Sequence, residues 1–211
     1  LIAAGRESSS IYLTGSPQFD YLANPKLAHS ANSWRSNNNL TSKDVIIFFA
    51  DQPEPNNPSL TTSICLELVN ICEKKGFKLV VRPHPSNTSL DESLLGDRCY
   101  ISRIPGELSD IIFSCTIGIT LSSTVGWELL LANKPTIALA MSQYSQFVTY
   151  GDNDGALRIN SLDKLECSID VLLDPSSALS RKLEMYRSSL PPPGGASSKV
   201  ANLIDSHFTQ N

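Results

Sequence analysis

The sequence predicts an α/β domain with a mainly parallel β-sheet, and three observations support this class. Short runs of Val, Ile, Leu and Phe alternate along the chain with segments of helical periodicity. Most of these runs are apolar at consecutive positions, as expected for strands that helices cover on both faces. The chain has 211 residues and 41% hydrophobic content, which is enough to bury a core. We therefore expect a three-layer sandwich of helices, sheet and helices.

The elements follow from the same patterns. Strands are expected at residues 10–14, 44–50, 77–82, 98–102, 117–121, 135–140 and 156–159. Helices are expected at residues 58–75, 106–114, 124–133, 161–173, 176–189 and 197–207. The helix from Pro58 is the clearest, because apolar residues recur every three or four positions and Gly76 ends it before the next strand. This region forms one strand–helix–strand unit.

The chain divides into four predicted parts. Residues 1–23 form a hinge segment with the first strand, and residues 24–43 form a linker loop rich in Asn and Ser. Residues 44–190 form the main domain, and residues 191–211 form a closing helix after a run of three prolines and two glycines. The sequence begins with Leu1 and shows no signal-peptide pattern, so we expect a fragment of a longer protein.

Composition disfavours several classes of protein. The net charge is −4 and the 17 Lys and Arg residues are scattered, so we expect no nucleic-acid partner. No apolar run approaches the roughly 20 residues of a membrane-spanning helix, so any membrane association would come from parts outside this chain. The five cysteines are odd in number and widely spaced, which argues against disulfides and favours the cytoplasm. No His pair or carboxylate cluster has ligand spacing, so no metal site is expected.

Three consecutive hydroxyl residues, Ser122, Ser123 and Thr124, lie between a predicted strand and a predicted helix. Ligands of open parallel sheets bind beyond the carboxyl ends of the strands. The hydroxyl groups and the first N–H groups of the helix, which lack intrahelical partners, could together bind a phosphate. The alternative is that Ser123 or Thr124 only caps the helix. Glu128 of this helix either accepts hydrogen bonds from two ribose hydroxyls or interacts with the helix dipole.

Polar residues also follow two other predicted strands. His84 lies between two prolines, which restrict the backbone and so present its imidazole in one direction. We expect His84 to stabilise charge on a departing phosphate, with Arg82 as a second cation; the alternative is a loop His that only caps the strand end. Gln52, which follows Asp51, either contacts the edge of a base or sugar or belongs to a turn.

Several common site patterns are absent from the sequence. It contains no Gly-rich phosphate loop with Lys and Ser or Thr, and no G-x-G-x-x-G run after a strand, which disfavours P-loop and dinucleotide sites. It also contains no G-x-S-x-G run of the kind found in hydrolases. The run from Asp152 to Gly155 has the composition of a calcium loop but lacks the final Glu, so we interpret it as a tight turn.

Four segments carry a resemblance to a known family. They are Ile11-Tyr-Leu-Thr-Gly-Ser-Pro-Gln-Phe-Asp20, Lys78-Leu-Val-Val-Arg-Pro-His-Pro85, Ser122-Ser-Thr-Val-Gly-Trp-Glu128 and Gly194-Gly-Ala-Ser-Ser-Lys-Val-Ala-Asn-Leu-Ile204. They resemble the hinge, the HP motif, the Ser-rich donor loop and the closing helix of the C-terminal half of GT-B glycosyltransferases. The resemblance is strongest to bacterial capsule and surface-polysaccharide transferases of the CDP-glycerol glycerophosphotransferase, Kdo-transferase and sialyltransferase-like groups. It implies a Rossmann-like, donor-binding domain over nearly the whole chain.

The resemblance also implies a site. His84, Ser122, Ser123 and Thr124 would hold the phosphate of a nucleotide-activated sugar, with His84 as the catalytic residue, and Glu128 would hold the ribose. The segment from Asp51 to Pro53 is similar to the QP element of Kdo transferases that use a CMP-sugar. The donor would be a CMP-, CDP- or UDP-linked substrate, and no cofactor is implied.

The resemblance leaves the activity of this chain open between three classes. In GT-B transferases the acceptor site and the catalytic base usually come from the N-terminal domain, so that missing domain is the implied partner and this chain alone should bind donor without turnover. The Ser-rich loop is also similar to that of non-hydrolysing UDP-N-acetylglucosamine 2-epimerases. An epimerase-like enzyme and a non-catalytic nucleotide-binding or interaction domain are therefore the alternatives.

Overall fold

The computed structural model describes residues 3, 5–86, 90–148, 150 and 155–209. The chain forms two compact units. One consists of Leu1–Asn24 together with Pro192–Asn211, and the other spans Pro25–Pro191. The turn predicted at Asp152 begins outside the described residues.

The larger unit contains a six-stranded sheet with the order β3-β2-β1-β4-β5-β6, in which every pairing is parallel. The strands are β1 (Ile46–Ala50), β2 (Lys78–Arg82), β3 (Tyr100–Ile101), β4 (Ile117–Thr120), β5 (Thr136–Leu139) and β6 (Leu157–Ile159). The strand order reverses direction between β1 and β4, and sheets of this order bind ligands in the crevice at that reversal. The predicted α/β class with a parallel sheet is confirmed.

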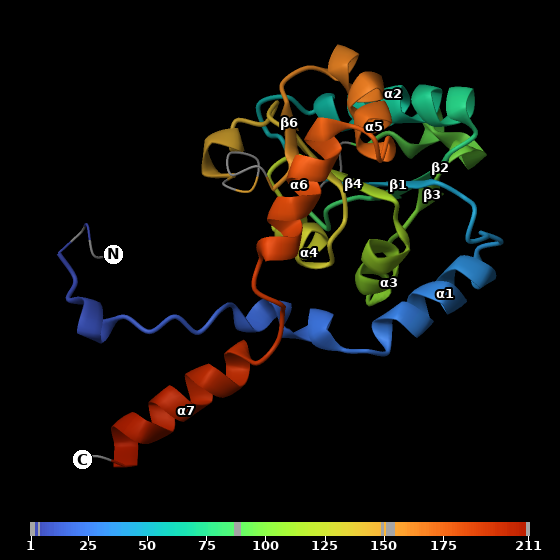
Figure 1. Ribbon diagram of the computed structural model, residues 1–211. Coiled ribbons are helices and arrows are strands. Elements are labelled where there is room, and N and C mark those ends of the chain that lie inside the picture. The colour runs from blue at the N-terminus through green and yellow to red at the C-terminus, as the bar shows by residue number, and fades with distance from the viewer. Residues whose placement is uncertain (1–2, 4, 87–89, 149, 151–154, 210–211) are drawn as a thin grey trace. The chain divides into compact units, whose positions relative to one another are not determined.

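Helices cover both faces of this sheet (Figure 1). One face packs against α2 (Leu60–Lys75) and α5 (Leu165–Leu173), and α6 (Ala178–Ser189) adds Leu183 to the same core. The other face packs against α1 (Leu27–Asn37), α3 (Glu107–Ser114) and α4 (Val125–Leu131). Short 3-10 turns occur at Ser8–Ser10, Pro17–Ala23, Glu92–Leu94, Gly96–Arg98, Ser145–Phe147 and Leu162–Lys164. The main domain is thus the predicted three-layer sandwich.

The core strands explain why the sheet forms. All five residues of β1 are buried, with Phe48 on the α1, α3 and α4 face and Phe49 on the α2 and α5 face. Gly118 of β4 allows α4 to lie unusually close to the sheet, because a Cβ at this position would lie 2.3 Å from Cδ1 of Leu129. This close packing fixes where α4 begins, and therefore where the turn between β4 and α4 lies.

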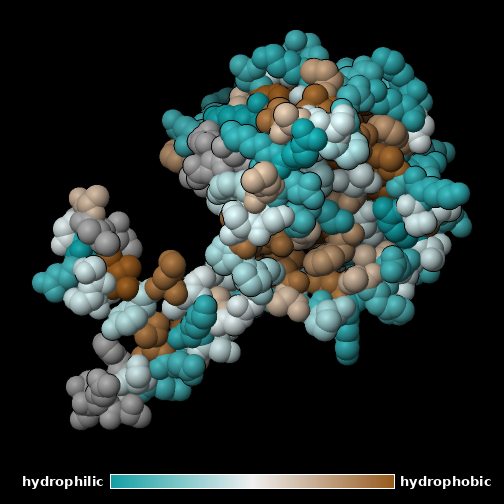
Figure 2. Space-filling model, viewed as in Figure 1, coloured by the Kyte–Doolittle hydropathy of each residue, from teal (hydrophilic) through white to brown (hydrophobic). Residues whose placement is uncertain are grey.

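The surface over α2 and α5 is mostly polar. Figure 2 shows mostly hydrophilic side chains over α2 and α5. Lys74 of α2 pairs with Glu166 of α5 at 2.7 Å, and Lys75 pairs with Asp170 at 2.7 Å. In the part of the chain that the structure describes, no helix combines the length and the apolar character needed to cross a membrane.

The smaller unit joins the two ends of the chain. Asp20 accepts hydrogen bonds from the N–H groups of Ala196 (3.0 Å) and Ser197 (2.7 Å), which are the first residues of α7 (Ala196–Thr209). The hydroxyl of Ser197 and these N–H groups lower the pKa of Asp20. Gly194 precedes the helix at φ +109°, and a Cβ there would lie 2.8 Å from that of Ala23. Asp20 therefore caps the closing helix.

Two predictions of secondary structure are wrong. Residues 24–43, predicted to be a linker loop, contain α1, whose Trp34 is buried and donates to Glu107 at 3.2 Å. The low helix propensity of Asn and Ser amounts to only a few tenths of a kcal/mol per residue, which burial of one large side chain outweighs. Residues 10–14, predicted to be a strand, pair with no strand among the described residues, and Leu13 is 97% exposed.

Candidate functional site

Four polar loops meet at the carboxyl edge of the sheet. They follow β1, β2, β4 and β5 and comprise residues 51–59, 83–86, 121–124 and 140–144. Neighbouring strands lie about 4.8 Å apart, so the ends of β2 and β4, on either side of β1, lie about 10 Å apart. A ligand with a phosphate group and substituents on both sides is long enough to contact all of these loops.

The loop after β2 holds His84 in a defined orientation. The backbone N–H of His84 lies 3.5 Å from Oδ2 of Asp51, which follows β1 and is itself buried. Oδ1 of Asp51 accepts from Thr61 of α2 at 2.6 Å, so this carboxylate ties together two strand ends and a helix. The N–H of Ser86 donates to Nδ1 of His84 at 3.1 Å. Since Nδ1 accepts, the hydrogen of the neutral ring is on Nε2, and no described residue accepts it.

The turn after β4 uses only part of its hydrogen-bonding capacity. Ser123 accepts from the N–H of Val125 through Oγ (3.3 Å) and from the N–H of Gly126 through its carbonyl (3.1 Å). The prediction that the first N–H groups of the helix are open is therefore wrong for these two residues, because the turn closes on itself. Thr124 is exposed and its side chain makes no capping bond. In the described part of the chain, the N–H groups of Ser123 and Thr124 donate to no other residue.

Tyr150 contacts both this turn and α4. Its hydroxyl donates to the carbonyl of Ser123 at 3.0 Å, and burial raises its pKa. Its ring lies against Gly126, where a Cβ would be 2.3 Å from Cζ, and makes an edge-to-face contact with Trp127 at 5.8 Å. The hydroxyl turn is thus held by a packed aromatic side chain.

Glu54 lies at the same edge but has no role predicted from the sequence. It is 5% exposed, and Oε2 accepts from the N–H of Gln143 at 3.3 Å. Its Oε1 is buried and has no partner in the part of the chain that the structure describes. Asn56 also donates to the side chain of Gln143. The loop after β1 therefore passes the end of β4 to reach the loop after β5. A Glu between two prolines is typical of an exposed turn, so the sequence gives no signal for its burial.

The structure does not bring Arg82 to the hydroxyl turn. Its Nη1 donates to Oγ of Ser102 at 2.9 Å and to the carbonyl of Ile104 at 3.3 Å. Both partners follow β3, so the guanidinium is held on the outer side of β2, away from β4. Gln52 and Glu128 are half-buried, the first in the loop after β1 and the second in the first turn of α4. Their predicted contacts with base and ribose stay predictions.

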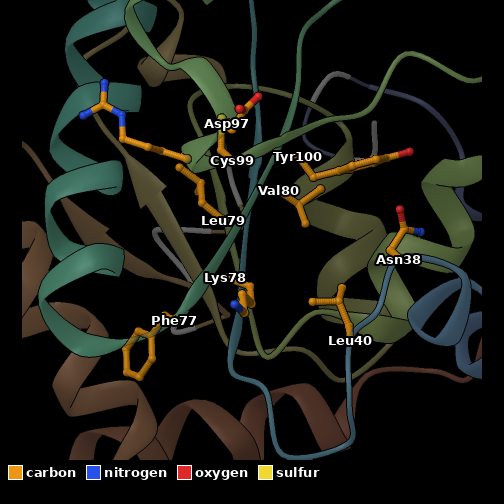
Figure 3. Close-up of a pocket in the computed structure, with 10 residues that line it drawn as sticks. Asn38, Leu40, Phe77, Lys78, Leu79, Val80, Asp97, Cys99 and Tyr100 are labelled. Atoms are coloured by element: carbon orange, nitrogen blue, oxygen red, sulfur yellow. The ribbon is translucent and has the colours of Figure 1, made fainter.

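A cavity of about 230 Å³ lies elsewhere, beside the start of β2 at the outer edge of the sheet (Figure 3). Two of its larger polar side chains already have protein partners. Arg98 donates to the carbonyls of Leu94 and Leu95, and the hydroxyl of Tyr100 donates to Glu107 at 2.8 Å. The Arg98 and Tyr100 side chains of this cavity are therefore occupied by the protein, unlike Nε2 of His84 at the carboxyl edge.

Comparison with other proteins gives a clear result only for structures. No protein-family model matches the sequence, and no curated protein matches it. Among solved structures, the chain is similar to the wall teichoic acid polymerase TagF, with 17% identity, a TM-score of 0.69 and coverage of 98% of this chain and 54% of that one. It is also similar to S. aureus MnaA in a co-structure with UDP, with 15% identity, a TM-score of 0.70 and coverage of 99% and 57%.

A third similar structure is the UDP-GlcNAc 2-epimerase of Methanocaldococcus jannaschii, with 16% identity, a TM-score of 0.66 and coverage of 97% and 58%. The chain thus spans between half and three fifths of the length of the structures it matches. The polymerase and the epimerase both have the GT-B fold. At these identities the likeness establishes the fold, and the chain has the fold of the C-terminal half of a GT-B enzyme.

Proposed function

We propose that this chain binds a nucleotide-activated sugar or polyol and is the donor-binding half of a cytoplasmic glycosyltransferase in surface-polysaccharide synthesis. Three findings support the proposal. The fold is that of GT-B enzymes, and the similar structures include a teichoic acid polymerase and a protein crystallised with UDP. The strand order reverses between β1 and β4, where such sheets bind ligands. The polar loops at that edge carry donors that have no acceptor among the described residues.

The observation that carries the proposal is the fixed tautomer of His84. Because the N–H of Ser86 occupies Nδ1, the ring presents an N–H group at Nε2, as recognition of a phosphate oxygen requires. The flanking prolines and the bond to Asp51 hold the loop, so little ordering entropy is lost when a ligand binds. The hydroxyl groups of Ser122, Ser123 and Thr124 supply further donors at the end of β4, on the other side of β1.

These donors would act on the leaving group of a transfer reaction. For a sugar donor, an acceptor hydroxyl attacks the anomeric carbon, the bond from that carbon to the phosphate oxygen breaks, and its electron pair stays on the oxygen. For a polyol donor, the hydroxyl attacks the distal phosphorus, the bond from that phosphorus to the bridging oxygen breaks, and the electron pair stays on the bridging oxygen of the departing nucleoside monophosphate. Donors aimed at this oxygen stabilise the transition state more than the ground state, because negative charge grows there. In this proposal His84 donates a hydrogen bond through Nε2, and the base that takes the acceptor proton belongs to the other half of the enzyme.

Calorimetric titration with CMP, CDP and UDP tests the proposal. We expect at least one of these nucleotides to bind, and His84→Asn to weaken that binding about 10-fold or more, as expected for loss of a hydrogen bond to a charged group. The Asn side chain keeps an acceptor for the N–H of Ser86 but has no counterpart of Nε2. His29→Asn, at an exposed position of α1, is the matched control and should leave affinity unchanged.

Two results would contradict the proposal. One is absence of binding by any of the three nucleotides at millimolar concentration, which would favour a non-catalytic interaction domain. The other is unchanged affinity in both His84→Asn and Ser123→Ala. The second candidate function is epimerisation, since one of the similar structures described above is a UDP-GlcNAc 2-epimerase. Assay of the full-length protein for epimerisation of UDP-N-acetylglucosamine and for glycosyl transfer separates the two.

A further inference from the structure

We propose that Glu54 is a ligand-binding residue of this site and that its carboxylate accepts a hydrogen bond from a hydroxyl group of the transferred sugar or polyol. The inference rests on the proposed function and extends it to the part of the donor that is not the nucleotide. Neither the sequence pattern nor the resemblance assigns Glu54 a role.

The first argument is that the carboxylate is buried but only half satisfied. Glu54 is 5% exposed, and its single described hydrogen bond is the 3.3 Å contact of Oε2 with the N–H of Gln143. Its Oε1 is buried without a partner in the described residues. Carboxylates are rarely buried unless they are fully paired, because the desolvation penalty is large. A buried polar atom without a partner therefore points to a group that the protein binds from outside.

The second argument is that the loop holds this carboxylate rigidly beside the hydroxyl turn. Gln143, which binds Glu54, directly follows Ser142, and Oγ of Ser142 lies 3.5 Å from Oγ of Ser122. Asn56 fastens the same loop by donating to the side chain of Gln143. The loops after β1, β4 and β5 are thus joined at the point where the phosphate of the ligand is proposed to bind.

The third argument identifies the chemistry of the partner. An ionised carboxylate only accepts hydrogen bonds, so Oε1 repels phosphate and requires a donor. Among the described residues no three His, Cys, Asp or Glu side chains are grouped as a metal would need, so a protein-held cation does not explain Glu54. Sugar and polyol hydroxyls are neutral donors, and every nucleotide-activated donor carries several of them.

The fourth argument concerns which hydroxyls these are. Glu128, predicted to bind ribose, lies on α4, which packs on the same face of the sheet as α1 and α3. The loop of Glu54 leads into α2, which packs on the opposite face. In a nucleotide-activated donor the phosphates separate the nucleoside from the transferred group. With phosphate at the hydroxyl turn and ribose on the side of Glu128, the transferred group extends toward Glu54.

The test compares complete donors with their nucleotides. Calorimetry measures the affinities of UDP-N-acetylglucosamine against UDP, and of CDP-glycerol against CDP, for the unmodified chain and for Glu54→Gln. We expect Glu54→Gln to weaken binding of the complete donor about 10-fold, because a charge-assisted hydrogen bond becomes a neutral one, and to change binding of the bare nucleotide less than about twofold. Glu73→Gln, at an exposed position on α2, is the matched control.

Each other outcome overturns the inference in a distinguishable way. Unchanged affinity for both ligands would show that Glu54 does not bind the ligand. Equal losses for donor and nucleotide would show that Glu54 does not contact the transferred group. If Glu54→Gln lowers the thermal midpoint sharply, Glu54→Met, which keeps the length and apolar packing of the side chain, replaces it in the comparison. Absence of all nucleotide binding by the unmodified chain would refute the proposed function itself, and this inference with it.

Discussion

Two carboxylates at the carboxyl edge of the sheet, Glu107 and Glu54, differ in how completely the protein satisfies them. Glu107, at the start of α3, accepts from Trp34 (3.2 Å) and Tyr100 (2.8 Å) through Oε1 and from Ser102 (2.8 Å) through Oε2. Glu54 accepts one described hydrogen bond and keeps a buried oxygen without a partner in the described residues. The more exposed of the two carboxylates thus has the more complete set of donors.

The network around Glu107 serves the structure, whereas the region around Glu54 is the one that we propose binds a ligand. The network around Glu107 joins α1, the loop after β3 and α3, and through Ser102 it also holds Arg82. A fully satisfied polar network stabilises a single arrangement of its elements. A partly satisfied group destabilises the fold unless a ligand completes it, and such groups concentrate at functional sites.

The largest expected effect comes from removing the satisfied carboxylate. Glu107→Leu should lower the free energy of unfolding by about 2–3 kcal/mol, because it leaves three donors without their acceptor. Glu54→Met should lower it by only about 1 kcal/mol, because it leaves a single donor, the N–H of Gln143, without its acceptor. Urea denaturation monitored by circular dichroism measures both values. Equal destabilisation by the two substitutions would remove the distinction between the regions.

The sheet could be predicted from the sequence because its strands are continuous apolar runs. Each residue of Ile46–Ala50 is buried, so local composition and final environment agree. Helix α1 could not be predicted in the same way. Its segment is rich in Asn and Ser, and its stability depends on burial of Trp34 and on a hydrogen bond to Glu107, which lies 73 positions later in the chain. Contacts between distant segments leave no local signal.

Local sequence signals also decide which parts of the candidate site could be predicted. His84 and the hydroxyl turn could be found because they directly follow strand-like runs, and parallel strands end at a common edge. Arg82 is the last residue of β2, but its guanidinium binds Ser102 and Ile104, which follow β3, and the sequence could not show this. The burial of Glu54 at this edge could not be predicted, because its partner, Gln143, lies 89 positions later.

A second prediction concerns the support of the hydroxyl turn. Gly126→Ala places a Cβ 2.3 Å from Cζ of Tyr150, so the ring must move and its hydrogen bond to the carbonyl of Ser123 must lengthen or break. We expect a loss of about 1–2 kcal/mol in the free energy of unfolding, as for other overpacked sites, together with weaker nucleotide binding.

Tyr150→Phe is the matched variant, because it removes only the hydroxyl and leaves the packing of the ring in place. It should lower stability by about 1 kcal/mol, the contribution of one hydrogen bond. Thermal unfolding followed by circular dichroism and nucleotide titration give the two measurements for each variant. If Gly126→Ala leaves both stability and affinity unchanged, Tyr150 does not hold the turn.

The smallest expected effect at neutral pH concerns Tyr100, whose hydroxyl titrates within the network around Glu107. Burial, together with the hydrogen bond to Glu107, raises the pKa of Tyr100 to about 12, above the value of about 10 in an unfolded chain. A group whose pKa is raised by folding contributes its full stability below its unfolded pKa and loses it as the pH rises through the folded pKa. The Glu107 network should therefore weaken between about pH 10 and about pH 12.

Tyr100→Phe removes this titration. The difference in stability between the variant and the unmodified chain should therefore be constant below about pH 10. It should shrink, or reverse in sign, toward pH 12. Urea denaturation at a series of pH values measures it, and tyrosinate absorbance reports the ionisation directly. Glu54→Met should show no change in this range, because its carboxylate is not part of the network. A difference that stays constant up to pH 12 in Tyr100→Phe would mean that the hydroxyl of Tyr100 is not held by Glu107, and the network would lose one of its three donors.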